Sequence, residues 1–120
     1  MSKRILLISY DNGLVIARRP LLEQEGYRVS SALGFREAMR ASEDGSLNLL
    51  ILGHSIPRAD KEELIRAFHG ASDAPILSLW THHHHERVTD GINFLAFSDT
   101  PDKLLASVES IFARKSRAWA

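Results

Sequence analysis

The chain of 120 residues contains no cysteine. This absence excludes disulfide bonds, thiolate zinc sites, iron–sulfur clusters and a cysteine nucleophile, and it suits a reducing compartment. The sequence also lacks an apolar run of the roughly 18–20 residues that a membrane-spanning helix requires, and it opens without the pattern of a signal peptide. We therefore expect a cytoplasmic protein that does not enter a membrane.

An excess of charge of either sign is also missing. The 15 basic and 15 acidic residues give a formal net charge of +0, so no broad electrostatic surface for nucleic acid or anionic membrane is expected. Glycine-rich phosphate loops, metalloprotease helices and nucleophile elbows are absent, and we expect neither enzymatic activity nor a cofactor. The composition, 44% hydrophobic and 25% charged, is typical of one compact domain.

Five short runs of residues predict β-strands. Three of them are mainly apolar, bounded by turn residues and too short for a helix, which is typical of strands buried on both faces. These runs cover residues 4–9, 47–53 and 74–80. The runs 27–31 and 92–97 mix polar with apolar residues, as strands nearer a sheet edge do.

Helical patterns separate the predicted strands. Pro20 falls inside the first pattern, where it removes a backbone hydrogen bond, and we expect a kink there. Asp60 and Glu63 have the spacing of a capping box that opens the third helix, with Gly70 at its end. The patterns cover residues 12–26, 35–45, 60–70 and the segment from 101 onward.

The alternation of strands and helices predicts a doubly wound α/β fold, in which helices cover both faces of a parallel sheet. In the flavodoxin-like strand order 2-1-3-4-5, the first, third and fourth strands are central. These are the three most apolar runs, so we expect this order. Only ten residues separate Trp80 from Gly91, which predicts a shortened fourth helix.

Nearly the whole chain, from residue 3 to about 113, resembles the CheY-like receiver domain of two-component response regulators. The resemblance lies in the strands and in the turns that follow them. The matching segments are 3–11 (KRILLISYD), 22–29 (LEQEGYRV), 49–57 (LLILGHSIP), 74–80 (APILSLW), and 94–97 (FLAF) with 101–105 (PDKLL). The resemblance implies a (βα)5 fold and a role in signal transduction.

The positions that carry the chemistry of that family hold other residues here. Receivers bind Mg²⁺ with an acid pair, accept a phosphoryl group on an aspartate, and contact it with a hydroxyl residue and a lysine. The matching positions are Ser9 and Tyr10 for the acid pair, with Asp11 just beyond, Gly53 for the aspartate, Trp80 for the hydroxyl residue and Phe97 for the lysine. Phe94 matches the family's switch aromatic.

These departures remove the groups that phosphoryl transfer requires. The reaction needs a nucleophile, a positioned metal and cations that neutralise the transferring oxygens. Glycine offers no nucleophile, and one carboxylate at Asp11 is a poor Mg²⁺ site. The rings of Tyr10, Trp80 and Phe97 are instead expected to plug the mouth of the site.

The leading hypothesis is therefore a stand-alone bacterial pseudo-receiver that acts through contact with another signalling protein, with a homodimer left open as a further contact. A small-molecule sensor is the alternative, with its ligand at the carboxyl end of the sheet, where α/β folds generally bind ligands. The third hypothesis is a phosphorylatable receiver in which Asp11 holds the metal and Ser9 or Ser55 accepts. This hypothesis is disfavoured because the sequence has no lysine near the matching positions.

Two local features carry weaker signals. His82, His83, His84 and His85 follow the fourth predicted strand, and imidazoles bind Zn²⁺, Ni²⁺ or Cu²⁺. Contiguous residues in one loop rarely form a tetrahedral site, so we favour a solvated loop with incidental metal affinity over a pH-dependent loop. His54 is expected to be a polar loop residue rather than a ligand contact.

The domain is expected to end near residue 113. The tail, residues 114–120, is basic with a terminal aromatic. Such charges complement the carboxyl terminus of a helix, and chain ends commonly fray. We therefore favour a frayed tail over a segment that binds an acidic partner.

Overall fold

The computed structural model of the protein describes the backbone of residues 2–80, 93–97 and 101–118, and the side chains of 2–79 and 101–113. Five parallel strands form one sheet in the order β2-β1-β3-β4-β5, which confirms the predicted strand order. The strands are β1 (Arg4–Ser9), β2 (Arg28–Leu33), β3 (Leu49–Leu52), β4 (Ile76–Trp80) and β5 (Asn93–Phe97). The described helices are α1 (Asn12–Gln24), α2 (Phe35–Ser42), α3 (Arg58–Ala71) and α4 (Pro101–Ala118).

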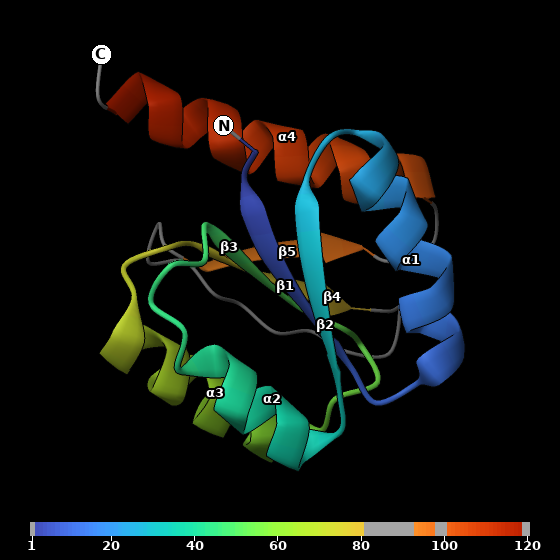
Figure 1. Cartoon of the computed structure of the whole chain (residues 1–120), viewed down its shortest axis with the longest axis vertical. Coiled ribbons are helices and arrows are strands. Elements are labelled where there is room, and N and C mark those ends of the chain that lie inside the picture. The colour runs from blue at the N-terminus through green and yellow to red at the C-terminus, as the bar shows by residue number, and fades with distance from the viewer. Residues whose placement is uncertain (1, 81–92, 98–100, 119–120) are drawn as a thin grey trace.

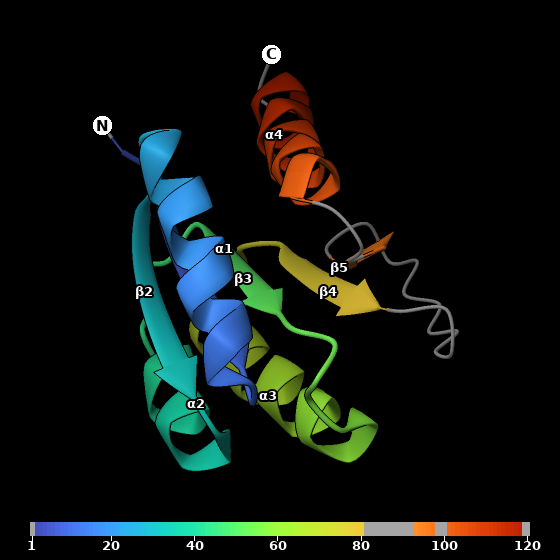
Figure 2. The same ribbon diagram turned by 90° about the vertical axis from the view of Figure 1, so that its right-hand side faces the viewer.

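Helices cover both faces of the sheet, as Figure 1 shows and the turned view in Figure 2 bears out. On one face, α1 and α4 pack on alternate strand residues such as Leu7 and Ile51. On the other face, α2 and α3 pack on the intervening residues, such as Ile8 and Leu52. All four of these strand residues are 0% exposed. Burial on both faces explains why β1 and β3 read as continuous apolar runs rather than alternating ones.

Helix α1 begins directly after β1 because Asp11 caps it. The Asp11 carboxylate accepts a hydrogen bond from the backbone N–H of Gly13 at 2.8 Å, which satisfies a donor that the helix start leaves free. The helix continues through Pro20 to Gln24. The proline leaves the Ile16 carbonyl without its helical partner, and Ile16 is 64% exposed, so water can replace the lost bond.

The predicted capping box at the start of α3 is wrong. The helix begins at Arg58 with Pro57 in the capping position, because a proline fixes the backbone at a helix start and needs no donor there. Asp60 therefore lies within the first turn, and its side chain accepts a hydrogen bond from Tyr10 instead. The helix also passes through Gly70 and ends at Ala71.

Helix α4 extends past the expected domain boundary at residue 113 to Ala118. Residues 114–118 are thus helical, and the boundary itself stays a prediction. The shortened fourth helix and the four histidines fall in 81–92, outside the described residues. Among the helices that the structure describes, none combines the length and the apolar character needed to cross a membrane.

Candidate functional site

The carboxyl ends of the parallel strands bring the family's functional positions to one edge of the sheet. Ile8 of β1 pairs with Leu52 of β3, so the residues that follow them, Ser9 and Gly53, are neighbours. Trp80 and Phe97 pair with each other at the ends of β4 and β5. In an α/β sheet this edge is where ligands bind. We call it the carboxyl edge.

The surroundings of Gly53 leave little spare room for a side chain. Its N–H donates to the Ile8 carbonyl at 2.9 Å, and the residue is buried. A Cβ atom at this position would lie 3.2 Å from the same carbonyl oxygen and 3.4 Å from Nη1 of Arg18. The first of these distances is tighter than a relaxed contact, and the second shows what fills the space beside the glycine.

Arg18 of α1 places a buried guanidinium at the carboxyl edge. The side chain is 8% exposed, its Nη2 lies 3.3 Å from Nδ1 of His54, and its Nη1 has no hydrogen-bond partner among the described residues. Burial lowers the pKa of Arg18, and the charge of Asp11 partly offsets this. Since arginine stays protonated in proteins, the site holds a permanent cation beside Gly53.

Sequence reasoning missed Arg18, although a signal existed. Val15, Arg18 and Leu22 are the buried residues of α1, and their spacing of three and four places them on one helical face. An arginine within an apolar stripe is rarely buried without a role. The contact with Arg18 also fixes the role of His54 in this hydrogen bond. Because arginine can only donate, Nδ1 of His54 accepts.

Hydroxyl groups occupy the place of the acid pair. The Ser9 side chain is buried, and its Oγ accepts from the Asp11 N–H at 3.0 Å and lies 3.2 Å from Oγ of Ser55. The Ser55 Oγ in turn accepts from the Tyr10 N–H at 3.0 Å. This network ties the loop after β1 to the loop after β3. It uses the polar atoms that the third hypothesis would need as acceptors.

Carboxylates for a metal are scarce at this edge. The Asp11 side chain is committed to the start of α1, and Asp60 is committed to Tyr10. In the part of the chain that the structure describes, no three His, Asp or Glu side chains gather in a way that could hold a metal ion. Hard cations such as Mg²⁺ require several oxygen ligands, and the expectation that this edge binds no metal stays a prediction.

The Tyr10 ring lies on the α3 side of the sheet. It is half-buried against the cluster that β1 and β3 form with α2 and α3, and its hydroxyl donates to Oδ2 of Asp60 at 2.8 Å. The predicted three-ring plug also needs Trp80 and Phe97, whose side chains lie outside the described residues, as does that of Phe94. The plug therefore stays a prediction.

The environment of Tyr10 predicts resistance to alkaline titration. Burial raises the pKa of Tyr10 well above its ordinary value, and the hydrogen bond to Asp60 and the charge of Asp60 raise it further. Because the folded state favours the neutral phenol, its stabilising contribution is present below the unfolded pKa of about 10 and is lost as the pH rises above it. Ultraviolet titration of the folded protein should show little tyrosinate at about pH 10.

The matched variants for this titration lie on one helix. Asp60→Asn should lower the pKa of Tyr10 only in part, because burial is the largest cause, whereas Glu62→Gln on the exposed face of α3 should leave it unchanged. Tyr27 is the other tyrosine, and burial raises its pKa as well, so Tyr10→Phe assigns the signal. Half-ionisation of Tyr10 near pH 10 in the folded protein, as in an exposed tyrosine, would contradict this environment.

A lysine also reaches the carboxyl edge, although the sequence pattern has none at the family's lysine position. Lys61 of α3 is 5% exposed, and its Nζ donates to the Leu79 carbonyl at 3.2 Å, one residue before Trp80. The sequence pattern did not predict this lysine, because the lysine of the receiver family follows the fifth strand and Lys61 lies on α3. Lys61 arrives from a different element, so it does not align with that lysine in sequence.

Comparison with family models finds no match. The regulatory protein VanRB of Enterococcus faecalis is 32% identical over 79 residues, which are 66% of this chain and 36% of that protein. The chain thus corresponds to about a third of this relative's length.

Solved structures resemble the chain over nearly its full length. A two-component response regulator from Clostridium difficile superposes with a TM-score of 0.79 and 19% identity, covering 95% of this chain and 98% of that one. The CheY-like receiver domain protein of Methanospirillum hungatei JF-1 gives a TM-score of 0.76 with 18% identity, covering 98% and 99%. The chain therefore has the CheY-like receiver fold of response regulators.

Proposed function

We propose that this chain is a pseudo-receiver of a two-component or phosphorelay-type system, and that it acts by contact with another signalling protein without being phosphorylated. The fold and the partial likeness to VanRB support the receiver part of this proposal. The observation that carries the second part is the pair Gly53 and Arg18. A glycine replaces the acceptor, and a buried guanidinium lies beside it.

The chemistry of these two residues works against a phosphorylation switch. An acyl phosphate forms on a carboxylate, which Gly53 lacks, and the metal that neutralises the transferring oxygens needs the acid pair that Ser9 and Tyr10 replace. Arg18 supplies a positive charge that is present at all times. A fixed charge cannot report a signal by arriving or leaving, so the surface of the domain keeps one state for its partner.

The small-molecule sensor is the alternative function. It depends on an open pocket between Tyr10, Trp80 and Phe97, and two of these three side chains lie outside the described residues. It therefore stays a prediction.

Incubation with acetyl phosphate and Mg²⁺ tests the proposal. Intact-mass spectrometry under non-acidic conditions, which preserve acyl phosphates, should show no added phosphoryl group, while a receiver with an intact acceptor aspartate gains one in parallel. A single phosphoryl addition that Ser55→Ala or Ser9→Ala abolishes would overturn the proposal and favour the third hypothesis.

A further inference from the structure

A basic cleft lies at the amino-terminal edge of the sheet, opposite the carboxyl edge. Its volume is about 390 Å³, and it is lined by Ser2, Lys3, Arg4, Arg28 and Asn48. Three of these five side chains are cationic, although the whole chain has a formal net charge of +0. The cleft is therefore a local concentration of positive charge rather than part of a generally basic surface.

The sheet register forces two of these cations together. Arg4 of β1 and Arg28 of β2 are direct partners across the parallel pair, and the backbone N–H of Arg28 donates to the Lys3 carbonyl at 2.9 Å. Like charges directly opposite each other on neighbouring strands destabilise a sheet. The Asp44 carboxylate relieves this repulsion on the side of Arg4, and an anion beside Arg28 would relieve the remainder.

Among the described side chains, a carboxylate pairs with one of the three cations. Arg4 pairs with Asp44 at 3.4 Å and also contacts Ser46. Two hydrogen bonds from Ser46, and then the charge of Arg4, lower the pKa of Asp44, so this carboxylate is already committed. For Arg28, no ion pair or side-chain hydrogen bond is found within the described ranges.

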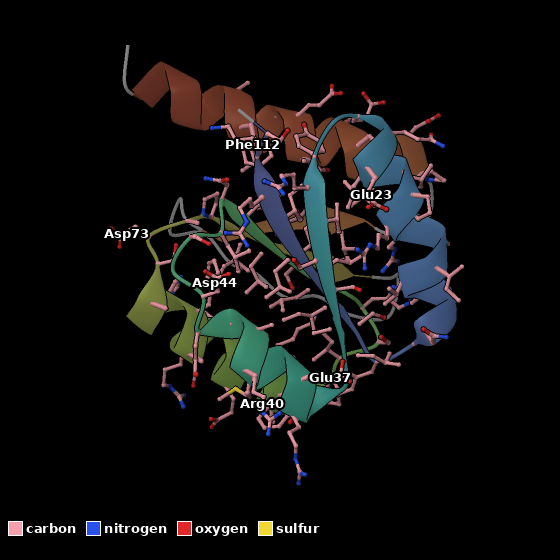
Figure 3. All side chains as sticks on the ribbon, in the orientation of Figure 1. Glu23, Glu37, Arg40, Asp44, Asp73 and Phe112 are labelled. Atoms are coloured by element: carbon pink, nitrogen blue, oxygen red, sulfur yellow. The ribbon has the colours of Figure 1, made fainter. Side chains whose placement is uncertain are left out.

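Lys3 completes the cleft on the side of α4. Its Nζ lies 5.7 Å from the ring centre of Phe112, and this ring contacts Tyr27, with 5.4 Å between the ring centroids. Figure 3 shows Phe112 and Asp44 on different sides of the start of β1. The cation–π contact holds the Lys3 ammonium on the α4 side of the sheet, whereas Arg4 and its register partner Arg28 lie on the other side. Arg28 is therefore the cation that the cleft offers to a ligand.

From this arrangement we infer that the cleft binds a small phosphate-bearing dianion. Guanidinium groups hold phosphate oxygens with two parallel hydrogen bonds. The backbone supports these groups rigidly, because Arg4 and Asn48 exchange two bonds: the Arg4 N–H donates to Oδ1 of Asn48 at 2.7 Å, and the Asn48 N–H donates to the Arg4 carbonyl at 2.8 Å. The volume falls in the range of small-molecule sites, roughly 300–1,000 Å³.

This inference does not depend on the proposed function. The cleft shares no residue with the carboxyl edge, and a phosphorylatable chain would bind the same dianion. Failure of one proposal therefore leaves the other standing.

Pyrophosphate is the probe for this cleft. In titrations of the full chain at low ionic strength, followed by amide NMR, we expect saturable shifts at Arg28 and Asn48. Arg28→Gln should weaken binding by about tenfold or more, because it removes a charge-assisted contact. Arg36→Gln, an exposed position on α2 near the other edge, should have no effect. Added salt should weaken binding, since the site is open to solvent.

Three results would overturn the inference. Pyrophosphate could fail to saturate, or Arg36→Gln could weaken binding as much as Arg28→Gln does. Alternatively, vesicles containing anionic lipid could bind in an Arg28-dependent way while pyrophosphate does not, in which case a membrane surface, and not a small dianion, occupies the cleft.

Discussion

Gly53→Asp is expected to create a buried ion pair with Arg18 and to leave the protein unphosphorylated. A Cβ atom at position 53 would lie 3.4 Å from Nη1 of Arg18, so the new carboxylate reaches the guanidinium at once. Removing one partner of a buried ion pair costs about 3–5 kcal/mol. Part of that cost is the interaction of the two side chains, so urea unfolding of Gly53→Asp, Arg18→Met and the double variant should give a coupling free energy of about 0.5–3 kcal/mol.

The neutral variant Gly53→Asn is the control for side-chain volume. Both substitutions press on the Ile8 carbonyl, which would lie 3.2 Å from the added Cβ, but only the aspartate gains the attraction of Arg18. Gly53→Asp should thus be more stable than Gly53→Asn, and this order should reverse when Arg18 is replaced by methionine. Additive effects of the two substitutions would mean that the carboxylate and the guanidinium do not meet.

Arg18→Met is expected to raise the free energy of unfolding by about 1–3 kcal/mol, because replacing a buried, incompletely paired charge by a packed apolar side chain is often stabilising. The guanidinium is 8% exposed and its Nη1 is unpartnered within the described part of the chain. Methionine is unbranched and adapts to the same space. Chemical denaturation of both proteins measures the difference directly.

The neighbouring arginine supplies the matched control for this substitution. Arg19 is half-exposed, donates to Oγ of Ser31 at 3.0 Å and pairs with Glu23 at 3.6 Å. Arg19→Met removes only contacts of a kind worth about 1 kcal/mol or less at a surface, so it should be neutral or slightly destabilising. If Arg18→Met destabilised the protein more than Arg19→Met, the account of an incompletely paired buried cation would be wrong.

Much of the fold could be predicted because burial leaves a direct pattern in the sequence. The continuous apolar runs that became β1, β3 and β4 identify central strands, and their placement gives the strand order. The ends of the elements were less accessible. Asp60 and Glu63 satisfied the spacing of a capping box, but Pro57 favours an earlier helix start, and a spacing rule does not weigh these two signals against each other.

The residues of the candidate site could be predicted only where they stand at, or directly after, the end of a strand in the sequence. Ser9 and Gly53 directly follow buried strands, so their place at the carboxyl edge follows from the parallel topology. Arg18 and Lys61 reach the same edge from helices, and whether a long side chain on a helix turns inward depends on the packing of three elements. That information is absent from a linear pattern, even though Arg18 falls within the buried face of α1.

Addition of beryllofluoride with Mg²⁺, which mimics a phosphoryl group on an acceptor aspartate, tests the central claim most directly. If the carboxyl edge has lost its switch chemistry, the amide NMR spectrum of the native chain should stay unchanged as the reagents are added. Saturable peak shifts confined to residues 9–11 and 53–57 would contradict the account, because they would place a divalent cation and an anion at a site that the structure assigns to Arg18.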